Sequence, residues 1–148
     1  MLKRLTEFNQ VIGNKQIIKK LQEDIKQNTL VDFIILVGNE GIGKTTLANI
    51  MAINLVKPSK DKIQEYINNN KQIEGIEKHS MSLDSSLDTV KKIVSDLKSS
   101  ISSTKVFILD EAQDISNYCQ NALLTDIEYL TEDKYVIMCT TDLSKINK

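Results

Sequence analysis

The chain has 148 residues, of which 41% are hydrophobic, and this length and composition favour one globular domain with a single core. The net charge of −1 and the scattered lysines argue against a large DNA-binding face on this segment. No apolar run approaches the roughly 20 residues of a membrane helix, and the N-terminus lacks the apolar core of a secretory signal, so we expect a cytoplasmic protein. Cys119 and Cys139 form no C-x-x-C pair, so we expect neither a disulfide framework nor a zinc site.

The first 30 residues predict a helix that precedes the first strand. Asn14 follows Gly13 and suits the N-cap position, because its side-chain oxygen can accept a hydrogen bond from the first turn. The polar residues 27–29 end this helix. Between these limits the apolar residues recur at helical spacing and form one face, which comprises Ile17, Ile18, Leu21 and Ile25.

Residues 31–46, VDFIILVGNEGIGKTT, contain a phosphate-binding motif between a strand pattern and a helix pattern. The spacing G-x-x-x-x-G-K-[ST] is that of the Walker A loop, whose backbone amides form a nest for anions. Glycines let this loop turn tightly, and the helix that begins near Gly43 or Lys44 adds the positive end of its dipole. A glycine-rich turn with an accidental lysine is the alternative, but the strand–loop–helix setting favours the motif.

The motif assigns a role to each of its side chains. We expect Lys44 to reach the β- and γ-phosphates of ATP and the Thr45 hydroxyl to ligate Mg²⁺. The predicted ATP-binding residues of this loop are Gly38, Asn39, Glu40, Gly41, Ile42, Gly43, Lys44, Thr45 and Thr46.

The middle of the chain is more polar. The helix after the loop stops before Pro58, and residues 60–67 predict either a short helix or a flexible insertion. Residues 76–82 form a weak strand pattern that suits the edge of a sheet, and His79 within it is expected to be a strand or surface residue rather than a catalytic base. Asp84 or Ser85 can cap the next helix, whose apolar face comprises Val90, Ile93, Val94, Leu97 and Ile101.

The run KVFIL at 105–109 predicts a third strand that ends in Asp110-Glu111. This pattern resembles a Walker B strand, in which Asp110 holds the Mg²⁺ shell and Glu111 orients or polarises the attacking water. An acidic pair after a strand is often a helix cap instead. Here the pair follows a Walker A motif, and this favours the catalytic interpretation.

The last elements complete an alternating pattern. Residues 114–130 predict a helix, and residues 135–139 predict a fourth strand that ends in Thr140-Thr141-Asp142. A polar residue there can bond the γ-phosphate or the attacking water, although the same three residues also suit a plain turn. Strands that alternate with helices predict an α/β fold, with a parallel sheet covered by helices and an active site at the carboxyl ends of the strands.

Taken together, these motifs resemble the AAA+ ATPases, and within them the delta-prime and gamma/tau subunits of the bacterial DNA polymerase III clamp loader. The order and spacing of the matches cover almost the whole chain, and the QNALL segment after the acidic pair is the feature most specific to clamp loaders. The matching segments are F-x-x-V-x-G at 8–13, GNEGIGKTTLA at 38–48, ILDEAQ at 108–113, QNALL at 120–124 and TTD at 140–142.

The resemblance implies further roles. Val11 and Ile12 would line the adenine pocket, and Thr141 would be the sensor 1 residue that acts with Lys44 and Glu111 in catalysis. It also implies a three-layer P-loop NTPase fold with strand order 5-1-4-3-2. The implied cofactors are ATP and Mg²⁺. The implied partners are other clamp-loader subunits and, through the full assembly, a sliding clamp and primer–template DNA, with no membrane and no zinc.

The chain also departs from the family pattern. Relatives of the gamma/tau type carry a four-cysteine zinc module after the Walker A helix, and this region has no cysteine here. Arg4 is the only arginine, and the Ser-Arg-Cys segment that supplies an arginine finger in the family is absent before Lys148. We therefore expect residues 1–148 to be a single AAA+ nucleotide-binding domain, a fragment without the fifth strand, lid and collar.

Four functions compete on these observations. The leading hypothesis is the ATPase module of a clamp loader, with little turnover by the chain alone. A P-loop kinase is less well supported, because such enzymes generally hold the transferred group with lid arginines. The other two alternatives are a scaffold subunit that binds nucleotide without hydrolysing it, and another AAA+ protein such as a helicase loader or initiator.

Overall fold

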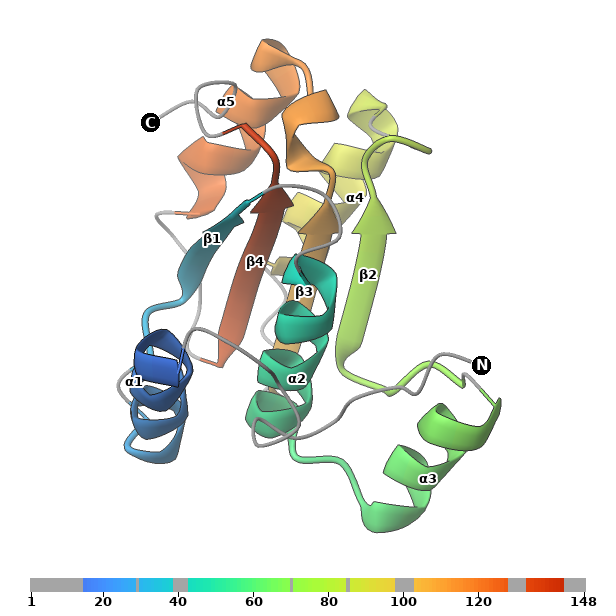
Figure 1. Cartoon of the computed structure of the whole chain (residues 1–148). Helices are drawn as coiled ribbons and strands as arrows, with labels where there is room; N and C mark the ends of the chain where they lie inside the picture. Colours follow the sequence, from blue (N-terminus) through green and yellow to red (C-terminus); the bar gives the residue numbers. More distant parts are fainter. Residues whose placement is uncertain are drawn as a thin grey trace.

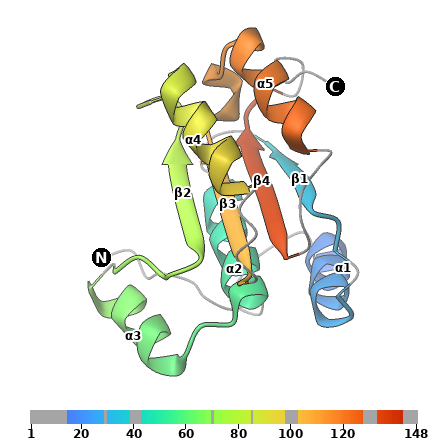
Figure 2. The same cartoon turned by 180° about the vertical axis from the view of Figure 1, so that it is seen from behind.

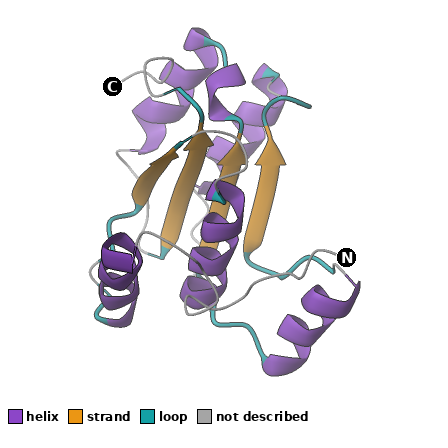
Figure 3. Cartoon of the chain, in the orientation of Figure 1, coloured by secondary structure: helices purple, strands orange, loops and turns teal. Residues whose placement is uncertain are grey.

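A computed structural model describes residues 15–28, 30–38, 43–69, 71–84, 86–97, 103–127 and 133–142 of the chain. Within these ranges four parallel strands form one sheet between two layers of helices (Figures 1 and 3), so the predicted three-layer α/β fold is confirmed. The strands are β1 (Phe33–Val37), β2 (Ile76–Ser80), β3 (Lys105–Asp110) and β4 (Lys134–Thr140). The helices are α1 (Lys15–Lys26), α2 (Lys44–Val56), α3 (Lys60–Asn69), α4 (Leu87–Leu97) and α5 (Asn117–Ile127), with a 3₁₀ turn at Ala112–Asp114.

The strand order is β1-β4-β3-β2, which agrees with the 1-4-3-2 part of the predicted AAA+ order. The described residues contain no fifth strand, and in them β1 pairs only with β4. β2 lies at the opposite edge, as its polar sequence predicts. The register aligns Val37 with Thr140 and Ser80 with Asp110, so the carboxyl ends of neighbouring strands lie level with one another.

The core has two halves, one on each face of the sheet. Side chains alternate along β3, so Val106 and Ile108 pack with α1 and α2 while Phe107 and Leu109 pack with α4 and α5. Figure 1 shows α1 and α2 in front of the sheet, and Figure 2 shows α4 and α5 on the other face. Every residue of β4 is buried, which explains why the central strands read as nearly continuous apolar runs.

Two stretches end differently from the prediction. β2 ends at Ser80 rather than at residue 82, because the Ser80 carbonyl accepts the N–H groups of Leu83 and Asp84 and closes a turn. Residues 60–69 are helical, so the first of the two alternatives for this segment is right. The expected continuation of α4 to Ile101 lies outside the described residues.

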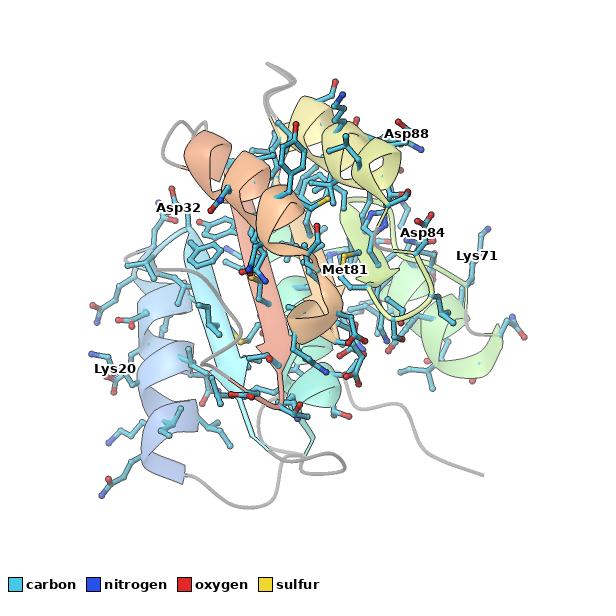
Figure 4. All side chains as sticks on the ribbon, turned by 90° about the horizontal axis from the view of Figure 1, so that it is seen from above. Lys20, Asp32, Lys71, Met81, Asp84 and Asp88 are labelled. Carbon is cyan, nitrogen blue, oxygen red and sulfur yellow. The ribbon has the colours of Figure 1, made fainter. Side chains whose placement is uncertain are left out.

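The predicted cap of α4 is wrong. Ser86 caps this helix, because its Oγ accepts the Thr89 N–H at 3.3 Å. Asp84, which lies before α4 in Figure 4, supports the cap from outside by accepting the Ser86 N–H at 3.1 Å and the Thr89 hydroxyl at 2.6 Å. The hydrogen bond from Thr89 is the largest cause of the lowered pKa of the Asp84 carboxyl. Ser85 is outside the described part of the chain.

The start of α5 also differs from the prediction. The chain passes through the 3₁₀ turn Ala112–Asp114 and an extended Ile115 before the helix begins at Asn117. Ser116 caps α5 by accepting the Cys119 N–H at 3.2 Å. In the described part of the chain, no helix is long and apolar enough to cross a membrane, and no group of three His, Cys, Asp or Glu residues could hold a metal ion.

Candidate functional site

The carboxyl ends of β1, β4 and β3 meet at the upper edge of the sheet in Figure 1. Because β4 lies between the other two strands, it contacts the segment that follows each of them. The Gly38 N–H donates to the Thr140 carbonyl at 3.1 Å, so the first residue of the phosphate-loop motif is fixed to the end of β4. The segments that carry the predicted site residues therefore lie at the same edge of the sheet.

The helix after the loop begins as the motif predicts. Gly43 has φ 93°, a left-handed conformation that glycine adopts without a steric penalty. The Leu47 N–H donates to the Gly43 carbonyl at 2.8 Å and starts the regular hydrogen bonding of α2. The N–H groups of Thr45 and Thr46 precede that bond, and such groups at a helix N-terminus attract phosphate.

Two side chains of the first turn of α2 contact other parts of the motifs. The Lys44 ammonium donates to the carbonyl of Gly38 at the other end of the loop. The Thr45 hydroxyl donates to Oδ2 of Asp110 at 3.0 Å, across 65 positions of the sequence. The fold thus places the Walker A threonine beside the Walker B aspartate.

The Thr45 hydroxyl and the Asp110 carboxylate are hard oxygen donors, and their separation of 3.0 Å lets both face one small cation. Oxygen ligands of this kind fit Mg²⁺, which usually completes its shell with water and substrate phosphates. When bound there, Mg²⁺ would neutralise charge on the phosphate oxygens.

Glu111 has an unusual backbone. Its φ of 54° and ψ of 46° are left-handed, and such a conformation in a residue other than glycine is often found at functional sites. Its N–H donates to Oδ1 of Asp110 at 3.0 Å, which holds the two acidic residues in a fixed relation. Its carboxylate accepts a hydrogen bond at 2.5 Å from Nε2 of Gln113, which lies in the 3₁₀ turn.

Gln113 also joins this carboxylate to the end of β4. Its Oε1 accepts the Thr140 hydroxyl at 3.0 Å, and Thr140 is 1% exposed. Sequence reasoning considered Thr140 for a polar contact but gave Gln113 no role. The available signal was a glutamine two residues after the acidic pair, a spacing at which a tight turn can point a side chain back.

The remaining predicted residues divide into two groups. Thr141 follows β4 and is half-buried, and its sensor role stays a prediction. Six predicted nucleotide-binding residues lie outside the described part of the chain: Val11, Ile12, Asn39, Glu40, Gly41 and Ile42.

Neither Cys139 nor His79 supplies a reactive group to this edge. Burial, and then the negative charge of Asp110, raise the pKa of the Cys139 thiol to about 12, so the thiol stays protonated and a poor nucleophile. His79 lies within β2, as predicted for a strand residue. Lys44, Thr45 and the two acidic residues remain the described candidates for phosphate and metal chemistry at this edge.

Comparisons with known proteins agree with this geometry. The family described as "DNA polymerase III, delta subunit" matches residues 13–148. The DNA polymerase III subunit gamma of Buchnera aphidicola subsp. Schizaphis graminum is 28% identical over 155 residues, which cover 98% of this chain and 42% of that protein. The DNA polymerase III subunit tau of Bacillus subtilis is 29% identical, over 97% of this chain and 27% of the relative.

Another curated relative is the Replication factor C small subunit of Sulfolobus acidocaldarius, which is 27% identical over 97% of this chain and 41% of that protein. The chain thus spans less than half the length of these relatives. Among solved structures, the RuvB Holliday junction branch migration motor of Thermotoga maritima has a TM-score of 0.67 and 20% identity, over 98% of this chain and 44% of that one. At that identity the likeness shows the fold alone.

Proposed function

Because the chain belongs to the DNA polymerase III, delta subunit family, we propose that it binds Mg-ATP as the nucleotide-binding module of a replication clamp loader. The family and the gamma and tau relatives identify a clamp-loader-type AAA+ domain, and the sheet has the matching P-loop order. Nucleotide binding by this chain is inferred from the contacts at the carboxyl edge of the sheet.

The single observation that carries the proposal is the hydrogen bond between Thr45 and Asp110. This hydrogen bond brings the Walker A and Walker B motifs together at the first turn of α2, and a P-loop ATPase needs both motifs at one site. The Lys44 ammonium lies at the same loop and is the cation that would bind the β- and γ-phosphates.

We also propose roles in the later steps. Glu111 would accept the proton of the attacking water, since a carboxylate at the end of β3 lies one residue from the proposed metal ligand. We assign hydrolysis to an assembly with other clamp-loader subunits. In that assembly, nucleotide binding would favour engagement of a sliding clamp, and hydrolysis would release the clamp on primer–template DNA.

Titration calorimetry with Mg-ADP and a slowly hydrolysed ATP analogue tests the proposal. We expect Lys44→Ala to weaken binding at least tenfold, which corresponds to about 1.4 kcal/mol. Lys20→Ala is the matched control, because Lys20 lies on the exposed side of α1 (Figure 4) and its removal changes the net charge equally. Equal affinity of the wild-type chain and Lys44→Ala would refute the site assignment.

Capture of a sliding clamp tests the identity of the assembly. A full assembly that contains this subunit should retain a sliding clamp only when ATP is present. Retention of a replicative helicase instead would favour the helicase-loader alternative.

A further inference from the structure

The side chain of Gln113 connects two parts of the site that the sequence motifs treat separately. It donates to the carboxylate of Glu111 at 2.5 Å and accepts from the hydroxyl of Thr140 at 3.0 Å. We propose that Gln113 is a positioning residue that holds the general base and ties it to the end of β4. This inference rests on the proposed function, in which the Glu111 carboxylate accepts the proton of the attacking water.

Only one orientation of the Gln113 side-chain amide gives each of these two hydrogen bonds a donor and an acceptor. The Glu111 carboxylate has no proton to give, so the Gln113 Nε2 group must face it and Oε1 is left to accept from Thr140. The reversed amide would bring two acceptor oxygens to 2.5 Å. The Thr140 hydroxyl oxygen in turn accepts the Asp142 N–H at 3.1 Å. The Thr140 hydroxyl also lies 3.2 Å from the Asp142 carbonyl, so its proton has two acceptors, of which Gln113 Oε1 at 3.0 Å is the nearer.

The anchor of the bridge is buried and adjoins Gly38, the first residue of the phosphate loop. Thr140 is the last residue of the fully buried β4, and its carbonyl accepts the Gly38 N–H at 3.1 Å. A continuous series of hydrogen bonds therefore runs from Gly38 through Thr140 and Gln113 to Glu111. A shift of the backbone at Gly38 would therefore move the Glu111 carboxylate, since Thr140 is hydrogen-bonded both to Gly38 and to the Gln113 side chain that holds Glu111.

The bridge also explains how a long side chain stays in one place. A half-buried glutamate has several rotamers, and fixing them costs conformational entropy that a hydrogen bond can offset. Proton transfer requires the carboxylate within hydrogen-bond reach of the water, and a misplacement of about 1 Å can cost about 10²-fold in rate. Gln113 would therefore affect the rate of hydrolysis rather than the affinity for nucleotide.

The bridge itself is tested on the 148-residue chain without nucleotide, by NMR of the Gln113 side-chain amide. We expect this amide to resonate apart from solvated glutamines and to exchange slowly with water. Glu111→Ala and Thr140→Val should move it to the solvated position, whereas Thr140→Ser keeps the hydroxyl and should leave it in place. An amide signal that none of these changes moves would overturn the bridge.

The positioning role is tested by single-turnover hydrolysis with the protein in excess, which measures even slow rates. We expect Gln113→Glu, which keeps the shape but replaces the donor with a like charge, to lower the rate about tenfold or more. Thr140→Val should act in the same direction, and Thr140→Ser should restore most of the rate. Mg-ADP affinity should stay within about twofold for each variant that thermal unfolding shows to be folded.

A double-variant comparison separates a positioning role from a structural one. In a Glu111→Gln background the base is already lost, so Gln113→Glu should cause no further fall in the residual single-turnover rate of the chain alone. A further fall of similar size would show that Gln113 does not act through Glu111 and would overturn the inference. Failure of the wild-type chain to bind nucleotide would instead overturn the proposed function, and the amide signal would still report on the bridge.

Discussion

At the scale of single residues, Glu111 and its neighbours fix most of the proposed chemistry. We expect Glu111→Gln to keep nucleotide binding but abolish hydrolysis in the full assembly, because an amide has the same shape and cannot accept the proton. Its side-chain oxygen can still accept the Gln113 amide, so the site should stay ordered. Calorimetry and phosphate release measure the two effects, and wild-type turnover by the variant assembly would contradict the role of Glu111.

Gly43 and Gly75 have nearly equal φ but different surroundings, so alanine substitutions at the two sites distinguish the cost of backbone strain from the cost of steric crowding. Gly43 has φ 93° and Gly75 has φ 94°. A Cβ on Gly75 would lie 3.1 Å from the Thr104 carbonyl oxygen and 3.2 Å from a Val56 methyl group, whereas one on Gly43 meets no described atom within 4 Å. Alanine at either site costs about 1–2 kcal/mol of left-handed strain, and Gly75→Ala adds about 1–3 kcal/mol of overpacking. Urea unfolding measures both, and equal losses would contradict the crowding argument.

The residues of the site differ in how well their roles could be predicted. Lys44, Thr45, Asp110 and Glu111 lie in contiguous motifs whose residue types and spacing carry the chemistry, and the fold brings the two motifs together. The bridge through Gln113 joins side chains 27 positions apart and depends on the direction of a 3₁₀ turn. No spacing in the sequence encodes that direction, and so the bridge was missed.

At the scale of elements, the strands and their helices were predictable and several ends were not. The buried strands β3 and β4 are apolar runs, and their predicted limits differ from the observed ones by one residue at each altered end. The segment before α4 offers three consecutive polar candidates for the cap. Only the folded geometry decides that Ser86 faces the Thr89 N–H.

The Ser86 cap should contribute measurably to the stability of the fold. We expect Ser86→Ala to lower the free energy of unfolding by about 1 kcal/mol, because the Thr89 N–H loses its acceptor. Ser95→Ala is the matched control, since Ser95 is exposed within α4 and alanine has the higher helix propensity there. The two alanine variants should therefore move the midpoint of thermal unfolding in opposite directions. A loss of equal size at Ser95 would contradict the capping argument.

At the scale of the whole molecule, the sheet presents the site on one edge and leaves β1 paired only with β4 in the described residues. The order β1-β4-β3-β2 was predicted from the family resemblance rather than from local pattern, because hydrophobic periodicity identifies strands but does not order them. The order has a functional consequence. It puts Gly38, the first residue of the phosphate-loop motif, next to Thr140, and the Thr45 hydroxyl 3.0 Å from Asp110, so the two motifs meet at one edge of the sheet.

The distribution of cations over the chain leads to the last prediction. The sequence has a single arginine, Arg4, and none occurs in the described residues. Charge that develops on the γ-phosphoryl group needs a cation besides Lys44, and an arginine finger is worth about 10³–10⁵ in rate. We therefore expect the chain alone to release phosphate at least about 10³-fold more slowly than its full assembly. Phosphate release by the wild-type chain measures this rate, and release by Lys44→Ala corrects for contaminating ATPases. Fast turnover by the chain alone that Lys44→Ala abolishes would contradict the prediction.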